Sequence, residues 1–216
     1  NVDSLGIVTA RGGVEFGASG VGGTITAAGA AEFVGIVTVK SDVSIADKII
    51  HTGDTNTAIR FPAADTFTVE TAGSERFRVT STGGLHLNNA ELMERVNITA
   101  GKLSDNQNIN LDNGMAHLFT TTETTTSTPN IISTAGINTN MATGDVLSVS
   151  IITTTAAAAY SERIKIDGLL TGITTSWNGG SAPSAGGASG KDFYSYTIIK
   201  TGDAAYTVLG NLSNFA

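Results

Sequence analysis

The most regular pattern in the chain lies in residues 57–88, TAIRFPAADTFTVETAGSERFRVTSTGGLHLN. Four pairs of apolar residues, each spaced by two, alternate there with polar positions, and three turn-forming segments (62–65, 72–75 and 81–84) separate the pairs. Alternation with a period of two predicts four short strands, each with one apolar and one polar face. The apolar pairs are Ile59 and Phe61, Phe67 and Val69, Phe77 and Val79, and Leu85 and Leu87.

An apolar face of two side chains per strand is too thin to form a core within one chain. At roughly 25 cal/mol per Å² of buried apolar surface, it offsets little of the ordering entropy unless it packs on copies of itself. Closed cyclic symmetry is usual for homo-oligomers, so we expect a homotrimer. The predicted trimer core consists of Ile59, Phe61, Phe67, Val69, Phe77, Val79, Leu85, Leu87, Leu92 and Val96.

The residues before this module are rich in glycine and contain a short repeat. GIVTA occurs at residues 6–10 and GIVTV at residues 35–39, with further short apolar runs bounded by Gly between them. This pattern predicts a Gly-rich stem of very short strands and tight turns over residues 1–56. An irregular Gly-rich linker is the alternative.

The segment that follows the module suggests the one helix of the chain. Residues 89–96, NAELMERV, offer Asn89 as an N-cap, Glu91 in the first turn, and Leu92 and Val96 four apart. Residues 99–114 are polar and rich in Asn, so we predict that residues 89–114 form a short helix and a polar connector.

Residues 115–216 show renewed alternation and predict a separate domain. Leu147, Val149 and Ile151 alternate with Ser, and Tyr194, Tyr196 and Ile198 alternate with Ser and Thr. Strands at this spacing over about 100 residues are typical of an antiparallel β-sandwich or jelly roll. The predicted fold class is therefore all-β, a fibrous short-strand stem followed by this domain.

Composition excludes several classes of protein. The chain has 216 residues, 26 Gly, 3 Pro, no Cys and a net charge of -7. Without Cys there is no disulfide framework and no thiolate chemistry. An acidic chain without basic runs has no electrostatic footprint for nucleic acid, and its apolar runs are too short for membrane insertion.

Three candidate sites in the sequence have simpler interpretations. The Gly-rich segments 17–23 and 186–191 lack the spacing of a phosphate-binding loop. The run Asp105–Gly114 is rich in oxygen ligands, but Gln107 and Asn110 break the calcium-loop pattern, so a solvated connector is preferred. His51, His86 and His117 are far apart in sequence, and His86 is expected on a solvated strand face. We expect no metal and no cofactor.

Trp177, the only tryptophan, precedes Asn178 and a loop of small residues. The two residues are the candidate receptor-binding site, because an aromatic ring gives a large contact area at low entropic cost. The alternative is that Trp177 closes one end of the domain core. The acidic residues form no recognisable catalytic pair, so no catalytic residue is assigned and no enzymatic activity is expected.

Several segments of the chain resemble tail-fibre-like virion proteins of marine cyanophages. The resemblance is carried by residues 49–87, by GKLSD at 101–105 with HLFTTTETTTSTP at 117–129, and by the C-terminal WNGGSAPS, YSYTIIKTG and YTVL segments. It implies a trimeric fibre or appendage on the exterior of the virion. Its N-terminal side would contact other virion proteins, and its C-terminal domain a glycan or protein of the host surface. A capsid decoration protein or head fibre, and a polysaccharide-degrading spike, are the alternatives.

Overall fold

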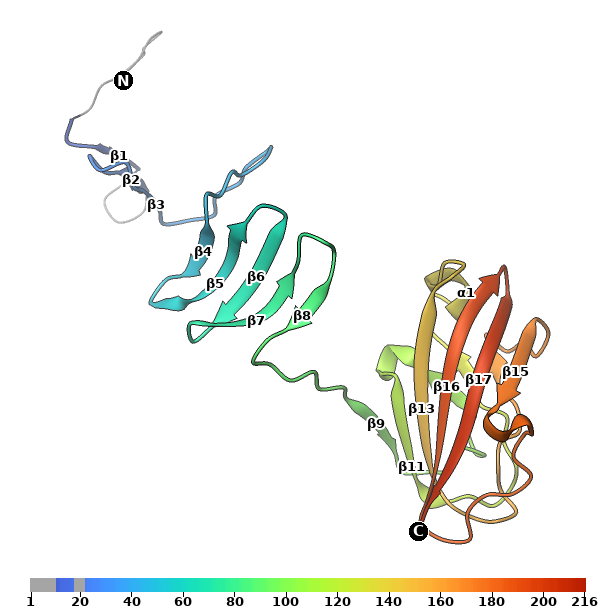
Figure 1. Ribbon diagram of the computed structural model, residues 1–216. Coiled ribbons are helices and arrows are strands. Elements are labelled where there is room, and N and C mark those ends of the chain that lie inside the picture. The colour runs from blue at the N-terminus through green and yellow to red at the C-terminus, as the bar shows by residue number, and fades with distance from the viewer. Residues whose placement is uncertain (1–10, 18–21) are drawn as a thin grey trace. The chain divides into compact units, whose positions relative to one another are not determined.

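The computed structural model describes residues 11–17 and 22–216 and is almost entirely β (Figure 1). The predicted all-β class is confirmed. Within the described residues, regular helix is limited to α1 (Ile137–Asn140) and two short 3-10 turns, Leu111–Asn113 and Asn178–Gly180. The chain divides into two compact units, Asn1–Glu91 and Leu92–Ala216.

The first unit contains a small antiparallel sheet of β1 (Val14–Phe16), β2 (Gly23–Ile25) and β3 (Ala31–Phe33). Gly23 is required there, because a Cβ would lie 2.7 Å from the ring of Phe16. These are the short strands expected between the two repeats. Of the two copies of the repeat, residues 6–10 lie outside the described residues, and residues 35–39 form no strand.

The same unit contains a five-stranded antiparallel sheet in which each strand pairs with the next. The strands are β4 (Lys48–His51), β5 (Asp54–Ala63), β6 (Thr66–Thr71), β7 (Ser74–Val79) and β8 (Leu85–Leu87). The four predicted strands are all present. The sheet begins at Lys48, earlier than the predicted boundary at residue 57, because β4 pairs with β5 and places Ile49 opposite Ile59.

The prediction of a helix at residues 89–96 is wrong. Residues 88–95 carry no regular structure, and β9 (Val96–Thr99) follows. Asn89 has φ +48°, whereas an N-cap residue has an extended backbone. A helix of two turns is marginal in isolation, and β9 instead gains a full ladder by pairing in parallel with β11 (Ala116–Thr122).

The second unit is built around a six-stranded sheet, whose long strands lie side by side in Figure 1. Its order is β15 (Ile173–Trp177), β17 (Ala205–Phe215), β16 (Lys191–Gly202), β13 (Val146–Thr154), β11 and β9. The three central strands are antiparallel, as expected, but β15 pairs in parallel with β17, and β11 pairs in parallel with both β13 and β9. The sheet is therefore mixed, and the expectation of a wholly antiparallel domain is wrong.

A second, smaller sheet completes the domain core. It consists of β10 (Asn108–Asn110), β12 (Asn130–Ile132) and β14 (Lys165–Ile166), all parallel. Its apolar residues share one core with the large sheet: Ile109, Ile131 and Ile166 from the small sheet, and Val149, Ile151, Tyr194, Tyr196, Ile198 and Val208 from the large one.

The predicted connector at residues 89–114 is only in part a connector. Leu103 and Ile109 are fully buried in the domain core, and β9 and β10 are strands of its two sheets. The C-terminal domain therefore begins at Leu92 and not at residue 115. Because polar residues lie on both sides of each buried side chain, the sequence shows no apolar alternation that would indicate these strands.

Candidate functional site

The five-stranded sheet carries its apolar side chains on one face, in two rows. Strand register places one row across all five strands and the other across β5 to β8. The rows are Ile49, Ile59, Val69, Phe77 and Leu87, and Phe61, Phe67, Val79 and Leu85. The rings of Phe61 and Phe67 lie 6.0 Å apart, and those of Phe67 and Phe77 lie 6.3 Å apart, so the face is continuous.

Among the described residues, the edges of this face are open to solvent, whereas Phe67, Val69, Phe77 and Val79 in its middle are half-buried. Ile59 is 40% exposed, Phe61 42%, Leu87 47% and Leu85 71%. Among the described residues before Leu92, the only buried apolar side chain is that of Ala58. The structure thus brings together the first eight residues of the predicted trimer core on one partly exposed surface, which we call the apolar face (the two rows above).

Leu92 and Val96 are not part of this sheet. Leu92 is exposed on the irregular segment before β9, and Val96 is the first residue of β9 in the other unit. Sequence reasoning missed Ile49, which extends one row onto β4. The sequence feature that could have indicated a strand there is the apolar pair Ile49–Ile50, which lies shortly before the turn at residues 52–53.

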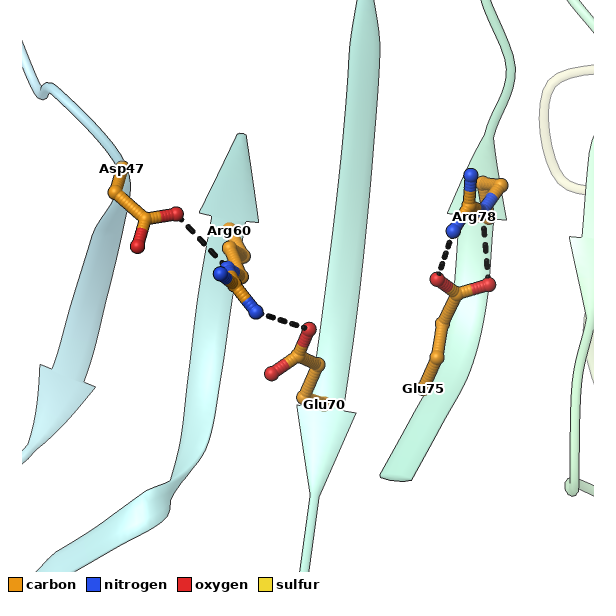
Figure 2. A network of polar contacts seen from close by, with 5 residues as sticks. All are labelled: Asp47, Arg60, Glu70, Glu75 and Arg78. Atoms are coloured by element: carbon orange, nitrogen blue, oxygen red, sulfur yellow. Dashed lines mark hydrogen bonds and ion pairs between the residues drawn. The ribbon is translucent and has the colours of Figure 1, made fainter. Parts of the chain in front are cut away.

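The opposite face of the sheet is polar, and two of its arginines form ion pairs (Figure 2). Arg60 Nε lies 2.8 Å from Asp47 Oδ1, and its Nη1 lies 3.5 Å from Glu70 Oε1. Arg78 contacts both carboxylate oxygens of Glu75. The hydrogen bond from Arg78 lowers the pKa of Glu75, and the bond to Asp47 raises that of Arg60.

Thr68 lies between the two arginines in the register and is fully buried, so their aliphatic stems cover the middle of this face. Among the described residues, Arg76, on the same face, has no carboxylate partner and donates to the hydroxyl of Thr71 and the carbonyl of Asn89. The two faces of the sheet therefore differ: one carries charged side chains, two of them in ion pairs with acidic residues, and the other carries apolar side chains.

In the C-terminal domain, the indole of Trp177 packs on the core. It is half-buried, meets the ring of Tyr196 edge to face at 5.8 Å, and its Nε1 donates a hydrogen bond to the carbonyl of Glu162 at 3.1 Å. Gly210 lies under the ring, where an added Cβ would come within 2.9 Å of Trp177 Cε3. These contacts match the alternative in which Trp177 closes the end of the core.

Asn178 is exposed beside Trp177, and its Nδ2 donates to Asn211 Oδ1 at 3.0 Å. Both residues line a shallow groove of about 350 Å³, together with Ser176, Ser195, Thr197, Leu209, Gly210 and Asn211. Small hydroxyl and amide side chains dominate this groove. It can hydrogen-bond a polar ligand while offering one edge of the indole for contact.

Three of the residues considered as metal ligands have other partners. Asp105 pairs with Lys102 at 3.1 Å, and Asp112 accepts from the backbone N–H of Thr134 at 2.8 Å. His117 is buried, with Nδ1 3.2 Å from Asn97 Nδ2 and Nε2 3.1 Å from the carbonyl of Gly114. Burial lowers the pKa of His117, so the neutral ring donates from Nε2 and accepts at Nδ1.

Across residues 11–17 and 22–216, no three His, Asp or Glu side chains gather in a way that could hold a metal ion. The same residues contain no helix of the length and hydrophobicity needed to cross a membrane. Comparison with protein-family models, with curated proteins and with solved structures returns no match.

Proposed function

We propose that this chain is a non-enzymatic structural protein on the exterior of a phage particle. It assembles as a homotrimer through the apolar face and forms a fibre or appendage, with its N-terminal side joined to other virion proteins. Its C-terminal domain contributes to attachment to the host surface, through a cell-surface glycan or protein.

The observation that carries the proposal is the unequal burial in the two units. The C-terminal unit buries a full core, including Ile131, Ile151 and Ile198, whereas the apolar face of the first unit has no fully buried side chain: it is half-buried in the middle and exposed at its edges. Apolar patches of this kind mark interaction surfaces. A self-complementary sheet face with paired charges on its other side suits assembly of identical copies about one axis.

The phage setting is supported by the resemblance of residues 49–87 and of the C-terminal segments to tail-fibre-like proteins. Three copies of a weak binding surface on one axis gain avidity through their high effective concentration, so a weak monomer site suffices for attachment. The groove beside Trp177 and Asn178 is one place where such contact can occur.

Sedimentation equilibrium tests the assembly. The chain has a mass of 22.0 kDa, so a trimer sediments at about three times that mass. Ile59→Lys places a charge in the middle of the apolar face, and we expect it to yield monomers. Val146→Lys is the matched control, because Val146 is an exposed apolar side chain on β13 of the other unit (57% exposed).

A wild-type chain that sediments as a monomer at micromolar concentration would contradict the assembly. The attachment role has its own test, in which the purified chain competes with phage for adsorption to cyanobacterial cells. Unchanged adsorption at saturating protein would argue against attachment and favour a purely structural role.

A further inference from the structure

The Asn-rich run of residues 105–114 lies on the outside of the C-terminal domain. Strand β10 directs Ile109 into the core, which leaves Asn108 exposed and Asn110 half-buried on its outer side. Asn106 and Asn113, on either side of this strand, are also exposed. The sequence pattern that resembles a broken calcium loop thus presents a series of amides and no cluster of carboxylates.

These amides line a hollow between edge strands of the two sheets. The hollow has a volume of about 320 Å³ and lies between Asn97 and Thr99 of β9 and Asn108 and Asn110 of β10. The buried side chains of His117 and Phe119 and the half-buried Ile132 of β12 complete its lining. The volume falls within the range of roughly 300–1,000 Å³ that is typical of ligand sites.

The hollow continues at both ends. It shares Asn97 and Asn113 with a larger open hollow of about 790 Å³ that runs along β9, and it shares Asn106 and Asn108 with one of about 330 Å³ that reaches Asn130. The three hollows adjoin one another at these common residues, and we treat them together as one groove. We call it the asparagine groove, defined by Asn97, Asn106, Asn108, Asn110, Asn113 and Asn130.

The amides in the groove have hydrogen-bonding capacity to spare. Within the described residues, the side-chain NH₂ groups of Asn106, Asn108, Asn110 and Asn113 donate to no protein atom. Each amide offers donors and an acceptor side by side. The middle hollow has no charged side chain in its lining, and the charged residues Glu94, Arg95, Asp105, Asp112 and Lys165 lie in the end hollows.

We propose that the asparagine groove binds an extended, neutral oligosaccharide. Sugar hydroxyls donate and accept at adjacent positions, which matches the paired groups of an amide. An elongated groove suits a chain of sugars better than a single ring, and the uncharged middle offers nothing to an anionic polymer, which the net charge of -7 also repels. The inference deepens the attachment part of the proposed function, on which it rests, and is independent of trimer assembly.

The test uses the full chain and immobilised linear oligosaccharides of six units, made of glucose, galactose, mannose or N-acetylglucosamine, beside a sulfated oligosaccharide and an extended peptide. We expect binding to at least one neutral oligosaccharide. The double variant Asn108→Ala, Asn113→Ala should weaken that binding by about tenfold or more, since it removes two amide partners. Asn140→Ala is the matched control, because it removes an exposed amide with one hydrogen bond, to Ser133, on the same domain.

Side-chain NH₂ resonances of Asn106 and Asn110 in the wild-type chain give a second readout that needs no substitution, and they should shift on addition of the bound sugar. Binding that survives the double variant and leaves these resonances unmoved would overturn the inference, while cell adsorption could still be blocked by another surface. Preference for the sulfated sugar or the peptide, or no binding to any neutral oligosaccharide, would overturn it as well.

Discussion

Two tyrosines at neighbouring inward positions of β16 differ in whether the buried hydroxyl group has a hydrogen-bond partner, and this difference affects the stability of the domain. The rings of Tyr194 and Tyr196 are stacked, with centroids 6.4 Å apart and planes 6° apart, and both residues are fully buried. The hydroxyl of Tyr194 accepts a hydrogen bond from the backbone N–H of Ser161 at 3.1 Å. The hydroxyl of Tyr196 has no partner among the described residues.

The two substitutions to phenylalanine should therefore have opposite effects. Tyr196→Phe removes a desolvated, unpaired hydroxyl and should raise the free energy of unfolding by about 1 kcal/mol. Tyr194→Phe leaves the Ser161 N–H without its acceptor and should lower it by about 1 kcal/mol. Urea unfolding followed by Trp177 fluorescence measures both, and equal effects of the two variants would show that the hydroxyls do not differ as described.

At the scale of elements, the β6–β7 hairpin contains a strained turn. Thr71 pairs with Ser74, so the loop consists of Ala72 and Gly73, with φ of +50° and +69°. Both positive values identify a type I′ turn, for which Asn-Gly is the preferred sequence. Alanine in this conformation costs roughly 1–2 kcal/mol.

Ala72→Asn should raise the stability of the five-stranded sheet by about 0.5–1 kcal/mol, because Asn tolerates the left-handed conformation better than Ala. Thermal unfolding of the full chain measures the change. Ala64→Asn is the control, since Ala64 is exposed in the β5–β6 turn but precedes the positive-φ residue Asp65. An equal gain from both variants would contradict the turn argument.

The elements differ in how far local sequence specifies them. The strands of residues 57–88 were predictable because alternation and turn residues lie next to one another in the chain. Strand β9 was not, since its pairing with β11 joins Val96 to Ala116 and overrides a marginal helix signal. The small parallel sheet joins residues near 108, 130 and 165 through strands of two or three residues, which are too short to recognise.

The candidate sites follow the same distinction. The apolar face was predictable, because one period-two pattern generates it. The packing of Trp177 was foreseen only as an alternative, since its partners Glu162 and Gly210 are distant in sequence. The asparagine groove was not predicted, because it forms only when β9 and β10 take their places at the edges of two sheets.

At the scale of the whole molecule, the two units rely on different sources of stability. The C-terminal domain has a core of its own, whereas Ala58 is the one fully buried apolar side chain among the described residues of the five-stranded sheet. All four tyrosines and the single tryptophan lie after residue 92, so their spectroscopic signals report on the C-terminal domain alone. This difference makes the two units separately measurable in the intact chain.

Alkaline pH should act on the C-terminal domain. Burial raises the pKa of Tyr194 from 10 to about 12 and raises that of Tyr196 further above its usual value. Above pH 10 an unfolded chain loses these phenolic protons while the folded chain keeps them, so the unfolded state binds fewer protons. The stability that the raised pKa values represent is present below pH 10 and is lost as the pH rises towards 12.

Thermal unfolding of the intact chain should accordingly show two transitions, one whose temperature depends on protein concentration and one whose temperature depends on alkaline pH. The transition of the five-stranded sheet should move to lower temperature on tenfold dilution, because mass action couples its folding to assembly, and Ile59→Lys should remove that dependence. The temperature of the C-terminal transition should not change on dilution, and the transition should appear in the tyrosine and tryptophan signals. Its temperature should fall between pH 10 and 12. Scanning calorimetry beside fluorescence measures both. A first transition that does not move with concentration would mean that the apolar face is not held by copies of the chain, and the trimer would have to be abandoned.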